Sequence, residues 1–338
     1  MPSPSNRVSP GNRPSVASVT VAYNGAEVLS RHLASLHHQT RKLDEIIVVD
    51  NASTDATRQL LSTQFPELTV LSLQKNLGIA GGLAAGLSYA ALEKNYDWIW
   101  IFDQDSVPAE DSLATLLSFL DLLGDAEPQT AILAPTCLHT DAAVEYPALS
   151  WHGSRFRPVT PSQSITFVDM VISSGSLMRS QAVRRAGPPR EDLFMDFVDY
   201  EYCLRLRQHG YRIAVVRDAV LEHAIGSPQS VRLFGRNFSW ADHAPWREYY
   251  MTRNEIFTIS QYRQGLFAKL FVLYRLAHHA LGILLFGKQK LECLRMIWYG
   301  LIDGLSGKLG IRFLPHEPDR QQTSPSSVPA SSIARGTT

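Results

Sequence analysis

The chain has 338 residues, of which 45% are hydrophobic, and its 32 Lys and Arg balance its 32 Asp and Glu. This composition is ordinary for a folded protein with one large core or two smaller ones, and the zero net charge gives no support to a nucleic-acid partner. The three cysteines lie far apart without metal or redox spacing, which favours a reducing compartment: Cys137, Cys203 and Cys293.

The two ends of the chain differ in composition from the rest. Residues 1–14 are rich in Ser, Pro and Asn without an apolar core, so we expect a disordered tail rather than a signal peptide or a membrane anchor. Residues 315–338 are again rich in Ser, Thr, Pro and Gln and predict a second disordered tail. Between the tails we expect a main domain over residues 15–245 and a helical extension over 246–314.

Strands and helices alternate from residue 16 onward. A first predicted strand ends at Asn24-Gly25, two residues that tolerate positive φ, and an amphipathic helix follows. A second strand ends at Asp50, and Ser53 or Asp55 is expected to cap the next helix. The predicted strands are 16–23, 45–50 and 68–73, and the predicted helices are 26–38 and the segment around 60–61. This alternation is typical of a parallel α/β sheet, which binds ligands at the carboxyl ends of its strands.

A glycine-rich segment, residues 76–86, comes next. Gly78, Gly82 and Gly86 recur every four residues, so a helix here would have a stripe without side chains on which a backbone or a nucleotide can lie close. The spacing is not that of a dinucleotide fingerprint or a P-loop. Tight packing of helix on sheet is the structural alternative for each glycine, and both interpretations stay open.

The next strand is the stretch around which the chain is organised. Residues 98–102 are β-branched and aromatic, and they are followed by Asp103, Gln104 and Asp105 and then by Val107-Pro108, which cannot continue a ladder. Residues two apart in a strand share a face, so the two carboxylates can converge on one ligand. A divalent cation with hard oxygen ligands, Mg²⁺ or Mn²⁺, would relieve their repulsion. The alternative is an acidic surface turn.

The regular alternation stops after a helix through 113–120 and a strand at 131–134. Residues 137–164 are polar and interrupted by three prolines, which predicts an irregular excursion. Two extended segments, 167–172 and 173–178, are expected to flank a turn of small residues around Gly175, which leaves room for a sugar or forms a plain β-turn.

A second acidic cluster covers residues 191–201. Acids in a first helical turn suit the helix dipole, but this does not account for so many around Phe194, Phe197 and Val198. An apolar wall would desolvate a carboxylate there, raise its basicity and make it a general base. Strand 211–216 and residues 220–227 follow; His223 could complete the shell of a metal, although a lone histidine is more often structural.

Taken together, these residues resemble the inverting glycosyltransferases of the GT-A fold, and within them the bacterial rhamnosyltransferase-like members. The resemblance covers about residues 16–254. It rests on the order and separation of these segments: 21–25, 48–55, 76–78, 103–106, 197–205, and His223 with Gly226. One departure is Ala84, where many relatives carry Asn.

The resemblance implies a role for individual residues. Asp50 would contact the nucleotide base or ribose, Asp103 the ribose and the metal side, and Asp105 the metal that bridges the diphosphate. Asp199 would be the catalytic base and His223 a further metal ligand. The other expected donor-binding residues are Tyr23, Asn24, Asn76, Gly78, Gly82, Gln104 and Gly175.

The implied activity is transfer of a sugar with inversion, from dTDP-rhamnose, to a hydroxyl of a glycan or lipid-linked acceptor in the synthesis of a cell-surface polysaccharide. Another nucleotide sugar, such as a UDP-sugar, is the first alternative. A metal-dependent phosphatase and a non-catalytic sugar-binding module are more distant ones. We expect a cytoplasmic enzyme that can lie at the inner face of the membrane.

The helical extension carries one further expectation. Between Leu266 and Phe286 the apolar residues fall on one face of a helix, and Lys269, Arg275 and His279 lie elsewhere. The charged interruptions argue against a membrane span but permit a helix that lies in the membrane interface. The sequence therefore predicts a peripheral membrane contact through the C-terminal helices.

Overall fold

The structure is a computed structural model that describes residues 13–123, 128–139, 145–152, 155–223, 229–233, 236–240, 243–262 and 265–314. The expected tails, apart from residues 13 and 14, and Gly226 lie outside these ranges.

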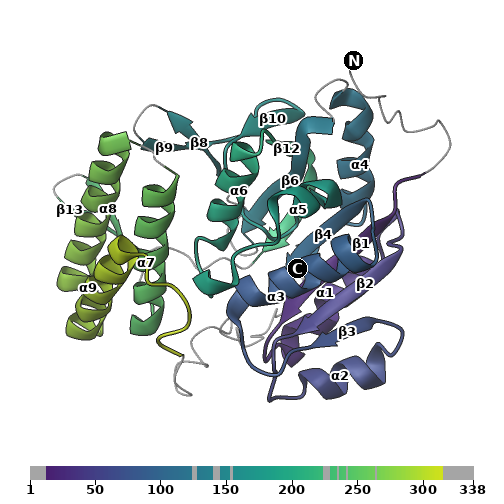
Figure 1. The fold of residues 1–338 in the computed structure, drawn as a ribbon, viewed down its shortest axis with the longest axis horizontal. Coiled ribbons are helices and arrows are strands. Elements are labelled where there is room, and N and C mark those ends of the chain that lie inside the picture. The colour runs from purple at the N-terminus through teal and green to yellow at the C-terminus, as the bar shows by residue number, and fades with distance from the viewer. Residues whose placement is uncertain are drawn as a thin grey trace, which may run out of the picture.

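A single mixed sheet forms the centre of the molecule (Figure 1). Its strands lie in the order β10-β12-β6-β11-β4-β1-β2-β3. Strands β4, β1, β2 and β3 are mutually parallel, β11 runs antiparallel between β4 and β6, and β6 and β12 are parallel again. The bounds are β1 Val16–Ala22, β2 Glu45–Asp50, β3 Thr69–Ser72, β4 Trp98–Asp103, β6 Thr130–His139, β10 Ile165–Val168, β11 Leu177–Arg179 and β12 Arg212–His223. The expectation of a mostly parallel α/β sheet flanked by helices is confirmed.

Strand β4 is buried on both faces, which is why its sequence is apolar throughout. Trp98, Trp100 and Phe102 join the core on one side of the sheet, and Ile99 and Ile101 join the core on the other. Charge appears only at Asp103, where the strand ends and the side chain becomes half-buried.

Helices cover both faces of the sheet. They are α1 Ala26–His37, α2 Thr57–Gln64, α3 Gly78–Ser88, α4 Ser112–Leu123, α5 Ser180–Ala186 and α6 Val198–Gln208, with a π-helical turn at Tyr89–Glu93 and a 3₁₀ turn at Glu191–Leu193. The expectation that Ser53 or Asp55 caps α2 is wrong, because the N-cap residue is Ala56 and no described side chain caps the helix. Asp55 accepts a hydrogen bond from the Thr57 backbone N–H, whereas Ser53 accepts one from Asn24.

The expectation of an irregular excursion over residues 137–164 is wrong. Strand β6 continues to His139, and the short strands β7 Glu145–Tyr146, β8 Ala148–His152 and β9 Arg155–Val159 follow, with β8 and β9 paired as a hairpin. Pro158 lies within β9, which pairs along one edge with β8 in a two-stranded sheet, and edge strands tolerate proline. The expected second extended segment is also shorter: residues 173–176 form a turn, and β11 begins at Leu177.

Three helices follow the sheet domain and stand side by side at one end of the molecule, with α2 and β3 at the other end (Figure 1). They are α7 Pro245–Gln261, α8 Gly265–Phe286 and α9 Lys290–Ser306. The two-residue strand β5 Val107–Pro108 and the hairpin β13 Gln229–Leu233 and β14 Arg236–Trp240 complete the fold. By length and composition, α8 is the one helix among the described residues that is apolar enough to cross a membrane.

Candidate active site

Three potential metal ligands converge at the carboxyl end of β4: Asp103 ends this strand, Asp105 lies in the turn after it, and His223 ends β12. The ligand atoms of Asp103, Asp105 and His223 all lie within 4.8 Å of one another. His223 Nε2 is 3.5 Å from Asp103 Oδ2, and His223 Nδ1 is 3.4 Å from Asp105 Oδ1. Two carboxylates and one imidazole at this spacing fit a divalent cation such as Mg²⁺ or Mn²⁺.

The pKa shifts of Asp103 and His223 indicate that this cluster favours a positive charge. Burial raises the pKa of Asp103, while the charge of His223 opposes that shift. Burial would lower the pKa of His223, but the hydrogen bond to Asp105 and the charges of the two aspartates outweigh it and hold this pKa above its ordinary value. A cation between the carboxylates would relieve the same desolvation cost and leave the imidazole neutral for coordination.

Three buried side chains hold the cluster from below. Ser106 Oγ lies 2.9 Å from His223 Nδ1 and 2.6 Å from Ser174 Oγ. His32 Nδ1 lies 2.5 Å from the Ser106 carbonyl oxygen, and its Nε2 lies 2.8 Å from Thr20 Oγ1. A carbonyl only accepts, so Nδ1 carries the proton and Thr20 donates to Nε2. Burial lowers the pKa of His32 to about 4, which makes it a neutral brace for Ser106.

The carboxyl ends of β1 and β2 meet the cluster from one side. In the sheet register Ala22 is opposite Asp50, and Val21 is opposite Asp103. Asn24 adopts a φ of 48°, and its side-chain oxygen accepts hydrogen bonds from the backbone of Thr54 and Asp55. The Gln104 amide accepts from Tyr23 N–H and donates to Tyr23 C=O. Asn24 and Gln104 thus shape the end of β1, and direct contact of these residues with a donor stays a prediction.

Asp50 is fully buried, and both of its carboxylate oxygens have protein partners. Oδ1 accepts from the Ser53 N–H, and Oδ2 accepts from Arg58 Nε at 2.6 Å. The charge of this carboxylate is therefore already compensated inside the protein. The expected contact of Asp50 with the base or ribose remains untested.

The glycines Gly78, Gly82 and Gly175 lie close against other parts of the protein, and their contact with a donor stays a prediction. A Cβ at Gly82 would lie 2.4 Å from Val21, so this face of α3 is pressed against β1. Gly78 has a φ of 70°, and a Cβ there would lie 2.0 Å from the Phe194 carbonyl oxygen. Gly175 has a φ of 77°, and a Cβ there would lie 2.8 Å from the side chains of Leu221 and Pro135. Packing of backbone on protein, the structural alternative, explains these glycines.

Asn76 and Asn51 set the start of α3. Asn76 Oδ1 accepts from Gly78 N–H and from the Asn51 amide, which also donates to the Gly78 carbonyl. Asn51 Oδ1 in turn accepts from Leu77 N–H. The side chain of Asn76 therefore organises the turn before α3, in a position where the sequence predicted donor contact.

The loop before α6 is strained. Phe194, Asp196 and Phe197 have φ values of 66°, 56° and 60°, a region that bulky side chains rarely occupy and that costs roughly 1–3 kcal/mol per residue. Asp199 follows in the first turn of α6. Such a conformation persists only where its surroundings enforce it, so the loop must be held from outside.

Helix α7 holds this loop. The Asn254 amide nitrogen donates to the carbonyl oxygens of Leu193, Met195 and Asp196 at 2.9, 2.6 and 3.0 Å. Arg253, fully buried beside it, donates to the carbonyls of Asp192 and Leu193. From the other side, Ala80 N–H donates to the Phe194 carbonyl. The C-terminal extension therefore fixes the segment that leads into Asp199.

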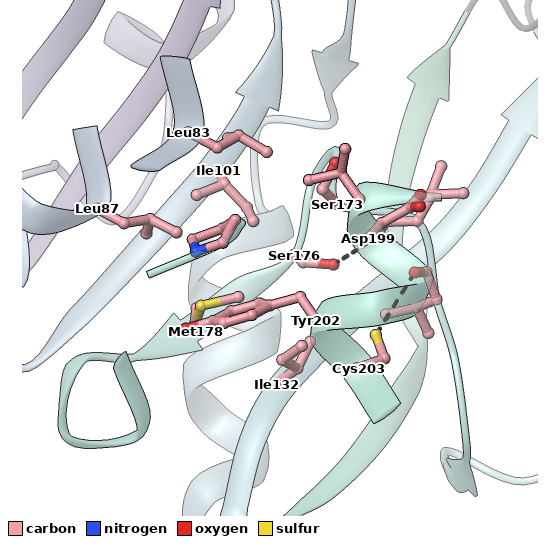
Figure 2. Close-up of a pocket in the computed structure, with 14 residues that line it drawn as sticks. Leu83, Leu87, Ile101, Ile132, Ser173, Ser176, Met178, Asp199, Tyr202 and Cys203 are labelled. Atoms are coloured by element: carbon pink, nitrogen blue, oxygen red, sulfur yellow. Dashed lines mark hydrogen bonds between the residues drawn. The ribbon is translucent and has the colours of Figure 1, made fainter. Parts of the chain in front are cut away.

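Asp199 lines a small, mostly apolar pocket, together with residues such as Ser173, Tyr202 and Cys203 (Figure 2). Burial raises the pKa of Asp199 to about 7, the Tyr200 N–H bond opposes this shift, and the charges of Asp103 and Asp196 add to it. A carboxylate with this pKa is a competent general base near neutral pH. Of the apolar wall expected from the sequence, Val198 lines this pocket with Asp199, whereas Phe194 and Phe197 are not among its lining residues.

The two neighbouring acids, Asp196 and Glu201, are bound to other side chains. Both oxygens of Asp196 accept from Arg247 on α7, at distances from 2.9 to 3.3 Å. Glu201 is buried between Arg205 and the hydroxyl of Tyr262. Because their partners occupy them, neither is positioned as Asp199 is to act as a base.

Comparison with known proteins identifies the family. Residues 18–131 match the sequence profile of glycosyl transferase family 2. The chain is 29% identical over 269 residues to the dTDP-rhamnosyl transferase RfbF of Shigella flexneri, covering 78% of this chain and 87% of that protein. It is 30% identical over 257 residues to the galactofuranosyltransferase GlfT1 of Mycolicibacterium smegmatis, covering 73% and 83%. The chain belongs to glycosyl transferase family 2.

Solved structures agree on the fold of this glycosyltransferase. S. aureus TarS 1-349 matches with a TM-score of 0.56 at 18% identity, covering 86% of this chain and 80% of that chain. The mannosyltransferase PcManGT from Pyrobaculum calidifontis, in complex with GDP-Man and Mn²⁺, matches with a TM-score of 0.53 at 15% identity, covering 88% and 89%. The GT-A fold is thus confirmed, and the phosphatase alternative is wrong.

Several residues of this glycosyltransferase site were missed from the sequence. Ser106, Ser174 and His32 support the metal cluster, and Asn254 holds the loop before Asp199. Tyr146 on β7 is close enough to Asp199 to feel its charge: burial raises the pKa of Tyr146, and the charge of Asp199 raises it further. Only Ser106 carried a local signal, because it directly follows the Asp-Gln-Asp sequence.

Proposed function

We propose that this family 2 enzyme transfers a sugar, rhamnose from dTDP-rhamnose, with inversion to a hydroxyl of a glycan or lipid-linked acceptor, in the cytoplasm and in the synthesis of a cell-surface polysaccharide. One observation carries the inverting chemistry: a half-buried carboxylate, Asp199, with a pKa raised to about 7 beside the Asp103, Asp105 and His223 cluster. The named activity of RfbF supports the choice of donor. Another nucleotide sugar remains the alternative, and the galactofuranosyltransferase relative is consistent with it.

The residues of the chain account for a direct displacement. The acceptor hydroxyl oxygen forms the new bond to the anomeric carbon, the bond from that carbon to the diphosphate oxygen breaks, and Asp199 takes the hydroxyl proton. The transition state resembles an oxocarbenium ion, as in glycoside hydrolysis, with the acceptor in the place of water. The products are a glycoside with inverted configuration and a nucleoside diphosphate.

Asp103, Asp105 and His223 would hold the divalent cation, Mg²⁺ or Mn²⁺, at the carboxyl end of β4. When bound, such a cation supplies positive charge that stabilises the departing diphosphate. Ser106 contacts Nδ1 of His223, which would leave Nε2, on the Asp103 side, free to bind the cation.

A donor screen tests the proposed activity. The full-length protein is assayed with dTDP-rhamnose, UDP-galactofuranose, UDP-N-acetylglucosamine and GDP-mannose, each with Mn²⁺, Mg²⁺ or EDTA and with a lipid-linked acceptor fraction. We expect dTDP release and rhamnose incorporation to depend on both metal and acceptor. Preferential turnover of a different donor would replace rhamnose by that sugar, and turnover of none would contradict the proposal.

The raised pKa of Asp199 predicts an acidic limb in the pH profile. Only the carboxylate accepts a proton, so kcat/KM should fall about tenfold per pH unit below about 7 and level off above it. The profile is measured with saturating metal and a non-titrating buffer series. A limb that persists unchanged in the residual activity of Asp199→Asn would assign it to another group.

The ionisation of Asp199 also predicts a difference in folding stability between wild type and Asp199→Asn. The folded state binds the Asp199 proton more tightly than the unfolded chain, whose pKa is near 3.8, so stability is lost as pH rises from about 4 through about 7. Asp199→Asn should therefore be more stable than wild type at pH 8, on the order of 1–2 kcal/mol because the side chain is only partly shielded, and equal to it near pH 4. Thermal unfolding without metal checks the sign.

Removing the amide donor of Asn254 should impair catalysis more than donor binding. Asn254→Asp keeps the shape of the side chain but replaces the amide nitrogen, which donates to three carbonyl oxygens, by an oxygen that cannot donate to them. The strained loop should therefore relax and displace Asp199. We expect kcat to fall about 10- to 100-fold with donor Kd nearly unchanged. The acidic limb should also move to lower pH, because Asp199 becomes more hydrated.

Tyr249→Phe is the matched control for Asn254→Asp. It removes another buried hydrogen bond of α7, from Tyr249 to Asp303, without touching the loop before Asp199. It should lower the melting temperature but leave the kcat and the pH profile in place. If both variants lose activity in proportion to stability alone, Asn254 has no positioning role.

A further inference from the structure

Helix α8 is amphipathic with its apolar face turned outward. The exposed large side chains recur every three or four residues, so they share one face of the helix: Leu266, Phe267, Leu270, Leu273, Tyr274, Leu281, Leu284 and Leu285. Residues Ala268, Val272 and Ile283 lie on the opposite face and are buried. The outward face of α8 therefore carries more large apolar side chains than its buried face.

The charged side chains near the middle of α8 turn toward the protein instead. Arg275 pairs with Glu255 at 3.1 Å, and His279 pairs with Glu248 at 2.8 Å; both acids are on α7 and are buried. These two contacts fix the rotation of α8 about its axis. Because turning α8 would leave the buried carboxylates of Glu255 and Glu248 without their partners, the helix cannot easily turn its leucines inward.

The exposed apolar surface is concentrated in the C-terminal helices. Of the nineteen exposed large hydrophobic side chains in the described part of the chain, fourteen lie between residues 266 and 314. On α9 they again share one face: Leu291, Trp298, Ile302 and Leu305. Single exposed apolar residues are ordinary, but a concentration of this size marks a surface that another apolar phase covers.

The charge of the same segment selects the occupant. Residues 265–314 contain seven Lys and Arg and two Asp and Glu, a net charge of +5 in a chain whose total is zero. Lys269 and Lys288 are exposed near the two ends of α8. If a second copy of the chain covered this surface, two segments of net charge +5 would face and repel each other. An anionic lipid surface offers both an apolar interior and the opposite charge.

We propose that the outward faces of α8 and α9 form a membrane-interface surface, on which the enzyme sits with α8 lying along an anionic bilayer rather than crossing it. Figure 1 shows these helices at the end of the molecule away from α2 and β3, so the sheet domain would stand in the water. The two ion pairs to α7 keep the charged middle of α8 on the protein side. Tyr274 and Trp298 suit the boundary between headgroups and acyl chains.

Vesicle flotation of the full-length protein tests the proposal. We expect binding to phosphatidylglycerol and phosphatidylethanolamine vesicles, weaker binding to phosphatidylcholine alone, and loss of binding at high salt. Leu270→Gln/Leu281→Gln/Leu284→Gln should reduce partitioning more than about tenfold. Lys269→Gln and Lys288→Gln should each reduce it about fivefold, on anionic vesicles only.

Leu92→Gln/Leu122→Gln is the control, since both leucines are comparably exposed but lie away from the C-terminal helices. Donor binding by calorimetry should be equal in all variants, which keeps this test independent of the proposed activity. Binding of the triple variant as tight as that of wild type, or no binding by wild type, overturns the proposal. The proposal is also overturned if light scattering shows a dimer for wild type and a monomer for the triple variant. The apolar surface would then be covered by a second copy of the chain.

Discussion

Asp199→Asn should lose turnover by about a hundred- to ten-thousand-fold, or roughly 3 to 5 kcal/mol of activation barrier, while donor affinity changes little. The base acts on the acceptor proton only as the new bond forms, so it stabilises the transition state much more than the bound donor. Asp199 has the pKa for this role, and Asn preserves its shape while removing the ability to accept the proton.

Two neighbouring acids provide matched controls. Asp196→Asn and Glu201→Gln should lose less turnover than Asp199→Asn, because Asp196 is paired with Arg247 and Glu201 with Arg205 and Tyr262. Donor binding by calorimetry is measured beside single-turnover transfer for all three variants. A dead Asp196→Asn together with an Asp199→Asn that transfers sugar at near the wild-type rate would place the base at Asp196 instead.

Asp105→Asn should weaken binding of the nucleotide sugar and reduce turnover by about a hundredfold or more. Asp105 belongs to the three-ligand cluster with Asp103 and His223, and replacing its carboxylate removes a full negative charge from a site built for a cation. The measurement is calorimetric titration of the donor with and without Mn²⁺ or Mg²⁺, followed by turnover under the same conditions.

Asp111→Asn is the control for Asp105→Asn, since Asp111 is an exposed carboxylate at the start of α4 and lies outside the cluster. It should behave as wild type in both assays. Wild-type enzyme treated with EDTA should match Asp105→Asn, and re-addition of metal should restore wild type alone. Undiminished turnover of Asp105→Asn, or of wild type in EDTA, would refute the metal assignment.

The sequence by itself determined the sheet and the place of its acids. Burial on both faces requires an uninterrupted apolar run, so residues 98–102 could be assigned to a central strand, and the polar residues that follow each run mark the carboxyl ends of the strands. Strand periodicity also predicted that Asp103 and Asp105 would converge. They do, but β4 ends at Asp103 and Asp105 lies in the turn after it, so the turn and not the alternation of the strand brings them together. These features depend on neighbours in the chain, which a local pattern records.

The glycine-rich segment shows the limit of such patterns. A stripe of glycines indicates that something approaches the backbone closely, but it does not say what. The structure places Val21 and the Phe194 carbonyl there, so the segment serves packing and the support of the loop before Asp199. Sequence spacing could not distinguish protein from nucleotide, because both demand the same missing side chain.

Only the tertiary structure decided which distant groups complete the site. His223 reaches the aspartates because β12 runs beside β6 with a register shift between Val216 and Val220, and Asn254 meets the loop at Asp196 across 58 residues. It also decided that Arg275 and His279 face α7, so that the leucines of α8 face outward. Helical periodicity gives the two faces of α8, but which face meets the protein depends on buried partners far away in the chain.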